Sequence, residues 1–346
     1  MKRIAIGVVV FAFLAAALGA AGSSEPKMDE LEPGLYAEIV TNRGAMVFSL
    51  DWKNAPLTVA NFAGLAEGLL PSESTETGER FYDGLPIYRV APKYAVFSGD
   101  PTGTGDGGPG YTLPRESNAA VSAADPGTLM MDGTATESSG SRFFVTVEGD
   151  DYLDRKYTPF GSLVIGMRTL KRLREGDAIE SVEIRPVGDE AEGLTVNPAV
   201  FDRLYSDARN AEIAALGRSN PQLADVLVSM GDPRRKTASG IFYTVVSPGE
   251  GEPPTAGSRV SLHYVGALVD GTVFDSSRVQ GRTFDFTLGQ DSVIPGWIEM
   301  VIDMRPGEVR QVAIPPSLAY GEQGIGPIAP NSWLLFEMEL VGVIEE

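Results

Sequence analysis

Few residues of this chain could act as nucleophiles, proton relays or metal ligands. It holds no cysteine and one histidine, His263, which excludes thiol catalysis, disulfides, histidine-rich zinc sites and two-histidine relays. A serine triad would have to use His263, which precedes Tyr264 in the strand-like run 260–265. Alternate side chains of a strand face opposite sides, so His263 faces away from any site that Tyr264 enters. We therefore expect His263 to be structural, and we expect no metal and no cofactor.

Aromatic residues, by contrast, recur in ordered blocks in the last third of the chain. The blocks are VSLHYVGALVDGTVFDSS (260–277), FTLGQDSVIPGWIEMV (286–301) and LAYGEQGIGPIAPNSWLLFEMELVGV (318–343). Because they keep order and spacing over about a hundred residues, chance is a poor explanation. They resemble the FK506-binding-protein (FKBP) family of peptidyl-prolyl cis-trans isomerases. The resemblance implies an antiparallel sheet wrapped on a short helix.

The same resemblance implies a prolyl pocket with Trp297 as its floor. Its walls would be Tyr264, Phe274, Phe284, Val293, Ile294, Ile328 and Phe336. The Ile294 amide and the Tyr320 hydroxyl would donate hydrogen bonds to substrate carbonyls, and Asp275 would lie at the rim. Ala329 stands where the family often has a second proline, which implies a modest change in specificity.

An apolar pocket of this kind suits rotation about an X-Pro bond. Rotation must break amide resonance, which gives a barrier of ~18–20 kcal/mol, and it requires no nucleophile. A dry pocket disfavours the polar planar amide relative to the twisted state, in which charge separation is smaller. Aromatic side chains therefore matter more here than charged ones.

Each of these residues also has a structural interpretation. Phe286, Leu288 and Leu335 are expected to be core. Taken singly, Phe274, Phe336 and Trp297 are typical core residues too, and Asp275 before two serines is typical of a turn cap. Their joint spacing favours the pocket.

The first half of the chain carries a second set of ordered motifs: YDGLPIYRV (82–90), GDPTGTG (99–105), GPGY (108–111), GTLMM (127–131), GSRFFV (140–145) and FG (160–161). Over about residues 31–188 they resemble cyclophilins, which implies an eight-stranded antiparallel β-barrel closed by helices. Gly103, Gly105 and Gly108 also match the dinucleotide pattern G-x-G-x-x-G. We reject that match because Pro109-Gly110 follows instead of a helix start.

The cyclophilin-like active site is partly present. Arg89 matches the guanidinium that holds the substrate carbonyl, and Phe144 matches the aromatic floor of the proline pocket. Tyr94, Tyr152 and Leu153 complete the candidate substrate-binding residues. The departures from the family are Tyr94 for Phe, Ala95 for Met, Phe97 for Gln, Asp132-Gly133 for Ala-Asn, Arg142 for Gln, Tyr152 for Trp and Tyr157 for His.

The lost glutamine normally orients the arginine, and a bulky Phe97 could narrow the cleft. Asp132 could pair with Arg89 or with Arg142. Two interpretations stay open: slow isomerase activity, or a barrel that binds peptide weakly or not at all. Tyr152 in place of the tryptophan implies poor cyclosporin binding.

Residues 1–22 have the pattern of a secretory signal peptide. Lys2-Arg3 precede an apolar run, 4–18, and small residues follow it. About fifteen apolar residues are few for a bilayer span, so we expect cleavage and export to the periplasm or beyond. The net charge of −19 argues against binding to nucleic acid or to anionic lipid. No other segment could cross a membrane.

A length of 346 residues suits two domains. We expect a signal peptide (1–22), a cyclophilin-like domain (31–188), a helical connector (195–232) and an FKBP-like domain (237–346). Within the first domain, 35–50 reads as a hairpin that turns at Asn42-Arg43-Gly44, and 54–69 reads as a helix with one apolar face.

Two helices are expected in the connector. Asn197-Pro198 and Asn220-Pro221 are typical helix starts, and Gly217 and Gly231 are typical stops. Residues 232–239 are expected to form a hinge. The connector also carries an apolar stripe, made of Val200, Leu204, Ala208, Ala211 and Ala215. This stripe could form a dimer interface or could pack on the barrel of its own chain, and we expect the second. The oligomeric state stays open.

These observations predict an exported peptidyl-prolyl isomerase that assists the folding of proline-containing polypeptides, with its main activity in the last domain. The alternative is a chaperone or adaptor that grips unfolded chains, with isomerisation secondary. The FKBP resemblance also names FK506 and rapamycin as candidate ligands of the last domain. Client proteins and the preferred residue before proline stay open.

Overall fold

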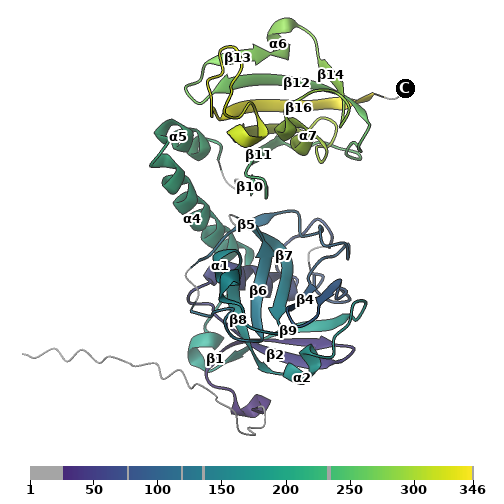
Figure 1. Cartoon of the computed structure of the whole chain (residues 1–346), viewed down its shortest axis with the longest axis vertical. Helices are drawn as coiled ribbons and strands as arrows, with labels where there is room; N and C mark the ends of the chain where they lie inside the picture. The colour runs from purple at the N-terminus through teal and green to yellow at the C-terminus, as the bar shows by residue number, and fades with distance from the viewer. Residues whose placement is uncertain (1–25, 76–77, 118–119, 135–136, 232–234, 345–346) are drawn as a thin grey trace, which may run out of the picture.

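The computed structural model describes residues 26–75, 78–117, 120–134, 137–231 and 235–344. The expected signal peptide lies outside these residues. Figure 1 shows two separate lobes, each built on a sheet, with two helices of the connector running between them.

The first lobe is a nine-stranded antiparallel sheet that curls onto itself. Its strands are β1 (Gly34–Thr41), β2 (Gly44–Leu50), β3 (Arg89–Ala91), β4 (Ala95–Ser98), β5 (Thr112–Pro114), β6 (Thr128–Gly133), β7 (Glu137–Thr146), β8 (Thr158–Ile165) and β9 (Ile179–Val187). The order is β3-β4-β7-β6-β8-β2-β1-β9, with β5 on β7. The two ends meet through the isolated bridge between Pro86 and Ala178 and the 2.7 Å hydrogen bond from the Ile87 amide to the Asp177 carbonyl. The predicted antiparallel barrel is confirmed, with β5 as an added strand.

Asp177 fastens the closing segment to the predicted β1–β2 hairpin, which the structure confirms. Its carboxylate accepts hydrogen bonds from Asn42 (3.1 Å) and from Arg43 Nε (2.9 Å). The Arg174 amide donates to it at 2.8 Å. The hydrogen bond from Arg43, followed by those from Arg174 and Asn42, outweighs burial and lowers the pKa of Asp177 to about 2.

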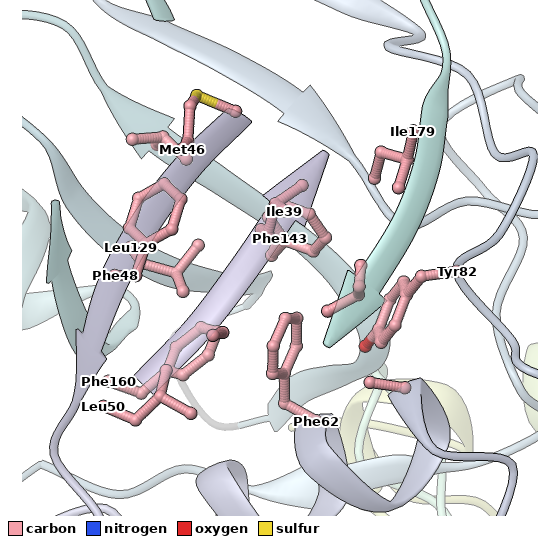
Figure 2. Close-up of a cluster of buried hydrophobic side chains, with 14 of the residues drawn as sticks. Ile39, Met46, Phe48, Leu50, Phe62, Tyr82, Leu129, Phe143, Phe160 and Ile179 are labelled. Carbon is pink, nitrogen blue, oxygen red and sulfur yellow. The ribbon is translucent and has the colours of Figure 1, made fainter. Parts of the chain in front are cut away.

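The barrel core is filled by aromatic and aliphatic side chains from the sheet and from α1 (Pro56–Ala66) (Figure 2). Phe62 of α1 packs against Tyr82 and Phe143, with ring centroids 4.9 and 5.7 Å away. We predicted one apolar face for this helix, but every residue from Leu57 to Ala66 is buried. The reason is that the connector covers the face that the barrel leaves open.

Short helical segments complete the first lobe: η1 (Met28–Glu30), η2 (Asp151–Arg155), α2 (Met167–Leu170) and α3 (Asp189–Glu192).

The connector is two helices, α4 (Pro198–Gly217) and α5 (Pro221–Ser229), as predicted. The Asn197 side chain accepts from the Val200 amide at 2.9 Å, and Asn220 accepts from the Leu223 amide at 3.1 Å. Each asparagine thus caps its helix, with proline in the first turn.

Helix α4 packs on its own barrel, as expected, and part of the predicted stripe takes part. Leu204 and Ala208 are partly buried against side chains of α1 and β5, whereas Ala211 is exposed. The most buried side chains of the helix lie beside the stripe, and they are Tyr205, Arg209 and Ile213. Counting apolar residues alone missed Arg209, which is fully buried.

Arg209 belongs to a buried ionic joint that links both lobes and α4. Its guanidinium donates to Glu137 of β7 at 2.8 and 3.0 Å. Lys236 Nζ lies 3.1 Å from the same carboxylate, and both cations also pair with Glu212. Thr112 donates to Glu137 at 2.9 Å and to the Lys236 carbonyl at 2.5 Å. Burial disfavours the charged form of Arg209, but its bonds to Glu137 and its charged neighbours outweigh burial and raise the pKa of Arg209.

The second lobe is a seven-stranded antiparallel sheet. Its elements are β10 (Arg235–Lys236), β11 (Phe242–Ser247), β12 (Arg259–Leu268), β13 (Val273–Ser276), α6 (Ser277–Gln280), β14 (Phe284–Thr287), α7 (Pro295–Val301), β15 (Val309–Ile314), η3 (Pro316–Leu318) and β16 (Leu334–Ile344). The order is β10-β11-β15-β16-β12-β13, with β14 on β12.

The expected hinge at 232–239 is wrong over part of its length. Arg235 and Lys236 pair with β11 and join the sheet, and Lys236 is buried in the ionic joint. Residues 232–234 lie outside the described residues.

Candidate active sites

Helix α7 presents Trp297 to the inner face of the second sheet. Ile294 has extended backbone angles, as the residue before a proline prefers, and Pro295 opens the helix. Trp297 therefore lies in the first turn, where it is 6 % exposed. Its indole Nε1 has no hydrogen-bond partner among the described residues.

Aromatic side chains surround Trp297. Ring centroids lie 4.8 Å away for Tyr264, 5.4 Å for Phe336 and 5.6 Å for Phe284. Phe274 extends the cage, 5.8 Å from Phe336 in an edge-on arrangement. Such edge-to-face packing fixes ring orientations, so the cage is preorganised.

Gly266 lets two of these rings approach the sheet. It pairs with Phe336 across β12 and β16 and with Asp275 across β12 and β13. A Cβ at this position would lie 2.8 Å from both the Phe274 and the Phe336 ring. Only a residue without a side chain leaves both rings in place. We did not predict this role, although Gly266 two residues after Tyr264 in a strand was a visible signal.

Asp275 and Tyr264 form the polar edge of the cage. The Tyr264 hydroxyl donates to Asp275 Oδ2 at 2.5 Å, and Gln280 donates to Oδ1 at 2.9 Å. Burial and then the hydrogen bond to Asp275 raise the pKa of Tyr264 above its ordinary value, so the phenol stays protonated. Asp275 also accepts from the backbone amide of Ser276 at 2.8 Å, while the Ser276 side chain caps α6.

Two donors at the cage carry no hydrogen bond to any residue that the structure describes. They are the backbone amide of Ile294 and the hydroxyl of Tyr320, whose side chain is 38 % exposed. These are the two donors that the FKBP resemblance assigned to substrate carbonyls. The site can therefore hold an extended peptide by its backbone while an apolar ring enters the cage.

The remaining predicted wall residues lie around the same cage. Val293 and Ile294 are half-buried before α7, and Ile328 is 6 % exposed in the loop before β16. Phe286 and Leu288 are core, as expected. Leu335 is not core of this sheet; it faces the other way and packs with α5 residues such as Leu227.

The candidate site of the first lobe has a different character. Arg89 of β3 is exposed and makes no ion pair with any described residue, and its guanidinium carbon lies 4.8 Å from the Phe97 ring centre. Asp132 pairs with Arg142 at 3.3 Å, and Arg142 also donates to the Gly107 carbonyl at 2.8 Å. Of the two pairings left open for Asp132, the structure has the one with Arg142.

Phe144 is covered rather than open. It is 2 % exposed, with the rings of Phe97 and Tyr157 centred 5.1 and 5.0 Å from it and Leu153 in the same cluster. Tyr152 stands outside this cluster, 52 % exposed. In this arrangement the rings of Phe97 and Tyr157 separate Phe144 from solvent.

Tyr94 is 71 % exposed beside this region, so its contribution to substrate binding stays a prediction.

Two family models match the chain at these two lobes. The model described as FKBP-type peptidyl-prolyl cis-trans isomerase matches residues 250–341, and the one described as cyclophilin type peptidyl-prolyl cis-trans isomerase/CLD matches residues 36–189. The chain belongs to the FKBP-type isomerase family and carries a cyclophilin-type domain as well. Both families are peptidyl-prolyl cis-trans isomerases, so the predicted fusion and the predicted enzyme class are confirmed.

Several curated proteins are similar to part of this chain. FK506-binding protein 1 of Dictyostelium discoideum is 46 % identical over 103 residues, which is 30 % of this chain and 96 % of that protein. Peptidyl-prolyl cis-trans isomerase Mip of Coxiella burnetii is 45 % identical over 31 % of this chain, and the FKBP-type isomerase FkpA of Escherichia coli K12 is 41 % identical over 32 %. This chain spans 46 % and 40 % of the length of these two bacterial relatives.

The one histidine of this two-family isomerase faces away from the Trp297 cage. His263 Nδ1 lies 3.1 Å from Ser277 Oγ, on the face of β12 opposite to Tyr264, as expected for a structural residue. The described residues contain no group of three or more acidic, histidine or cysteine side chains placed to hold a metal. They also contain no helix long and apolar enough to span a bilayer.

Proposed function

We propose that the FKBP-type domain carries the main isomerase activity, and that the cyclophilin-type domain binds prolyl segments with slow turnover or none. The observation that carries this proposal is the aromatic cage on Trp297 with two unpaired donors at its edge. The cage supplies the apolar surroundings that favour a twisted amide, and the donors hold the chain on either side of it. We place the domains at 31–188 and 237–346, with the connector at 195–232.

The cyclophilin-type site supports a lesser role. Arg89 keeps the charge needed to hold a carbonyl, but Phe97 offers no hydrogen bond to orient it. Moving the aromatic cover from Phe144 adds a cost to each binding event. Binding without rapid isomerisation follows from this arrangement.

Single substitutions in the full-length chain can distinguish the activities of the two sites. The isomerisation rate of short X-Pro peptides is measured for each variant by exchange NMR. Tyr320→Phe removes one donor and no packing, and a neutral hydrogen bond of about 1 kcal/mol corresponds to a rate loss of about five-fold. Arg89→Ala should leave the rate nearly unchanged. A large loss in Arg89→Ala with none in Tyr320→Phe would transfer the main activity to the barrel.

FK506 and rapamycin are proposed ligands of the cage, because it presents the apolar floor and free donors that such ligands require. Titration with FK506 should abolish most of the rate in the full chain. The activity that survives saturation belongs to the cyclophilin-type domain, and survival of the full rate would contradict the assignment.

We also propose that the protein is exported and assists folding outside the cytoplasm. The support is the pattern of residues 1–22, a basic head, an apolar run and small residues. Mass spectrometry of the protein secreted from an expressing bacterium should find an N-terminus just after this segment. An intact Met1 on cytoplasmic protein would contradict export.

A second candidate function is capture of unfolded chains as a chaperone or adaptor. It is favoured by a cavity between the barrel and α4 that shares no residue with either prolyl site. The test is suppression of aggregation of a proline-free client by the full chain with its cage blocked by FK506. No protection would remove this second function.

A further inference from the structure

A cavity of about 580 Å³ lies where the barrel meets the connector. Its walls come from residues 70–73 after α1, from residues 109–111 before β5 and from the first turns of α4. Arg235, at the start of the second sheet, completes the lining. Its volume is within the range of pockets that bind ligands, about 300–1,000 Å³.

The walls are mainly apolar, and hydrogen bonds hold their aromatic rings. Tyr111, Phe201 and Tyr205 form an aromatic row, with successive ring centroids 5.7 and 5.8 Å apart. The row is anchored at both ends, since Tyr111 donates to Asn61 at 2.8 Å and Arg209 donates to the Tyr205 hydroxyl at 3.1 Å. Fixed rings offer contact area at little cost in side-chain entropy, so an apolar group can bind without reordering the walls.

The rim is acidic. Asp202 is exposed, and its carboxylate makes no hydrogen bond or ion pair with any residue that the structure describes. Glu73 lies 3.8 Å from Arg235, a long separation between two exposed side chains. Two carboxylates against one cation leave the rim negative, and the chain as a whole carries −19. A ligand that places a cation beside its apolar group fits both features.

We propose that this cavity is a third polypeptide-binding site, which takes an extended segment with an aliphatic side chain next to lysine or arginine. The proposal rests on the second proposed function, capture of unfolded chains, and not on where isomerisation occurs. A client held here would bring its prolines to the two prolyl sites at raised effective concentration.

The probe is a short proline-free peptide with arginines on both sides of a photo-leucine, used on the full chain. Without proline it lacks the ring that both prolyl sites recognise. Its cross-links should fall on residues 70–73, 109–111 and 198–206. The same peptide with glutamates in place of arginines should bind much more weakly.

Four variants test the site by fluorescence anisotropy. Asp202→Lys reverses the rim charge and should weaken binding about three- to ten-fold, and added salt should reduce this difference. Ser206→Trp fills the cavity and should weaken binding more than about ten-fold. Asp207→Lys and Asp207→Trp, on an exposed position outside the cavity lining, are the matched controls and should bind like the parent chain.

Three results would overturn the proposal: cross-links concentrated in the Trp297 cage, equal affinity for Asp202→Lys and Asp207→Lys, or equal binding of basic and acidic peptides. Circular dichroism checks that Ser206→Trp is folded, and Asp202→Lys decides the question if it is not. Isomerase rates and client aggregation, measured on the same samples, separate failure of this site from failure of either proposed function.

Discussion

Replacing Glu137 by glutamine should destabilise the protein strongly, because this carboxylate neutralises two buried cations. Glu137 is 1 % exposed, and Arg209 and Lys236 around it are 0 and 7 % exposed. The amide keeps the shape and loses the charge. Glu212 then remains as the single anion for both cations, so two buried positive charges share one negative charge.

The expected cost follows from that charge imbalance. Breaking a buried pair by removing one partner costs about 3–5 kcal/mol, and partial compensation by Glu212 places Glu137→Gln near about 3 kcal/mol. For a unit of 150–250 residues this corresponds to a fall in Tm of about 6–12 °C. The matched control is Glu190→Gln, whose partner Lys53 is exposed, and it should cost less than about 1 kcal/mol.

Two assays check this reasoning. Urea unfolding followed by circular dichroism gives the free energy of unfolding for each variant. Limited trypsin digestion reports on the joint itself, because Lys236 is shielded in the parent chain and should be cut faster in Glu137→Gln. A cost equal to that of Glu190→Gln, with unchanged cleavage after Lys236, would refute the idea that Glu137 holds the joint.

Further changes test other parts of the molecule. Gly266→Ala places a methyl group 2.8 Å from the Phe274 ring. Isomerase activity should therefore fall by more than about ten-fold, while the free energy of unfolding drops by about 1–3 kcal/mol. An unchanged rate would show that the position of this ring is unimportant for catalysis. Asp177→Asn should remove part of the acid sensitivity of the fold. The lowered pKa of Asp177 adds stability above the unfolded pKa of about 3.9, and this stability is lost as the pH falls through about 2. The parent chain should therefore lose more stability than the variant between these two pH values, and parallel curves of urea midpoint against pH would contradict this. Phe97→Gln restores the residue that orients Arg89 and uncovers the cyclophilin-type pocket. The isomerisation rate that remains in the presence of saturating FK506, measured by exchange NMR, should therefore rise. No gain would indicate that the other departures from the family block this site.

The sequence indicated the FKBP-type site through its resemblance to that family, and the resemblance was visible because the residues that carry it lie in local blocks. Trp297 follows Pro295 within one helical turn, and Tyr264 and Gly266 lie two residues apart on one strand. Spacing of this kind is set by helix and strand periods, which can be counted along the chain. The free donors at Ile294 and Tyr320 came from the resemblance, and the structure leaves both without a partner among the described residues.

The cyclophilin-type site was less predictable, because its state depends on contacts between distant segments. The sequence left Asp132 with two possible partners, and sheet geometry brings it to Arg142. The sequence suggested that Phe97 narrows the cleft, and the structure shows how far: its ring packs on Phe144 and covers the pocket floor. Strand register decides that the Phe97 ring covers Phe144, and register between distant strands cannot be predicted from a local sequence pattern.

The chain alone thus indicated a pair of capped helices, because caps act over a few residues, and its ordered motif blocks indicated an antiparallel barrel, a second antiparallel sheet and a prolyl cage through their resemblance to two families. The joint between the lobes was decided by the tertiary structure. An arginine can be predicted to be buried only when the carboxylate that pairs with it is known. Glu137, the partner of Arg209, lies 72 positions away in the sequence. Charge burial depends on what the fold brings together across such separations, and hydrophobic counting along α4 therefore missed the buried Arg209.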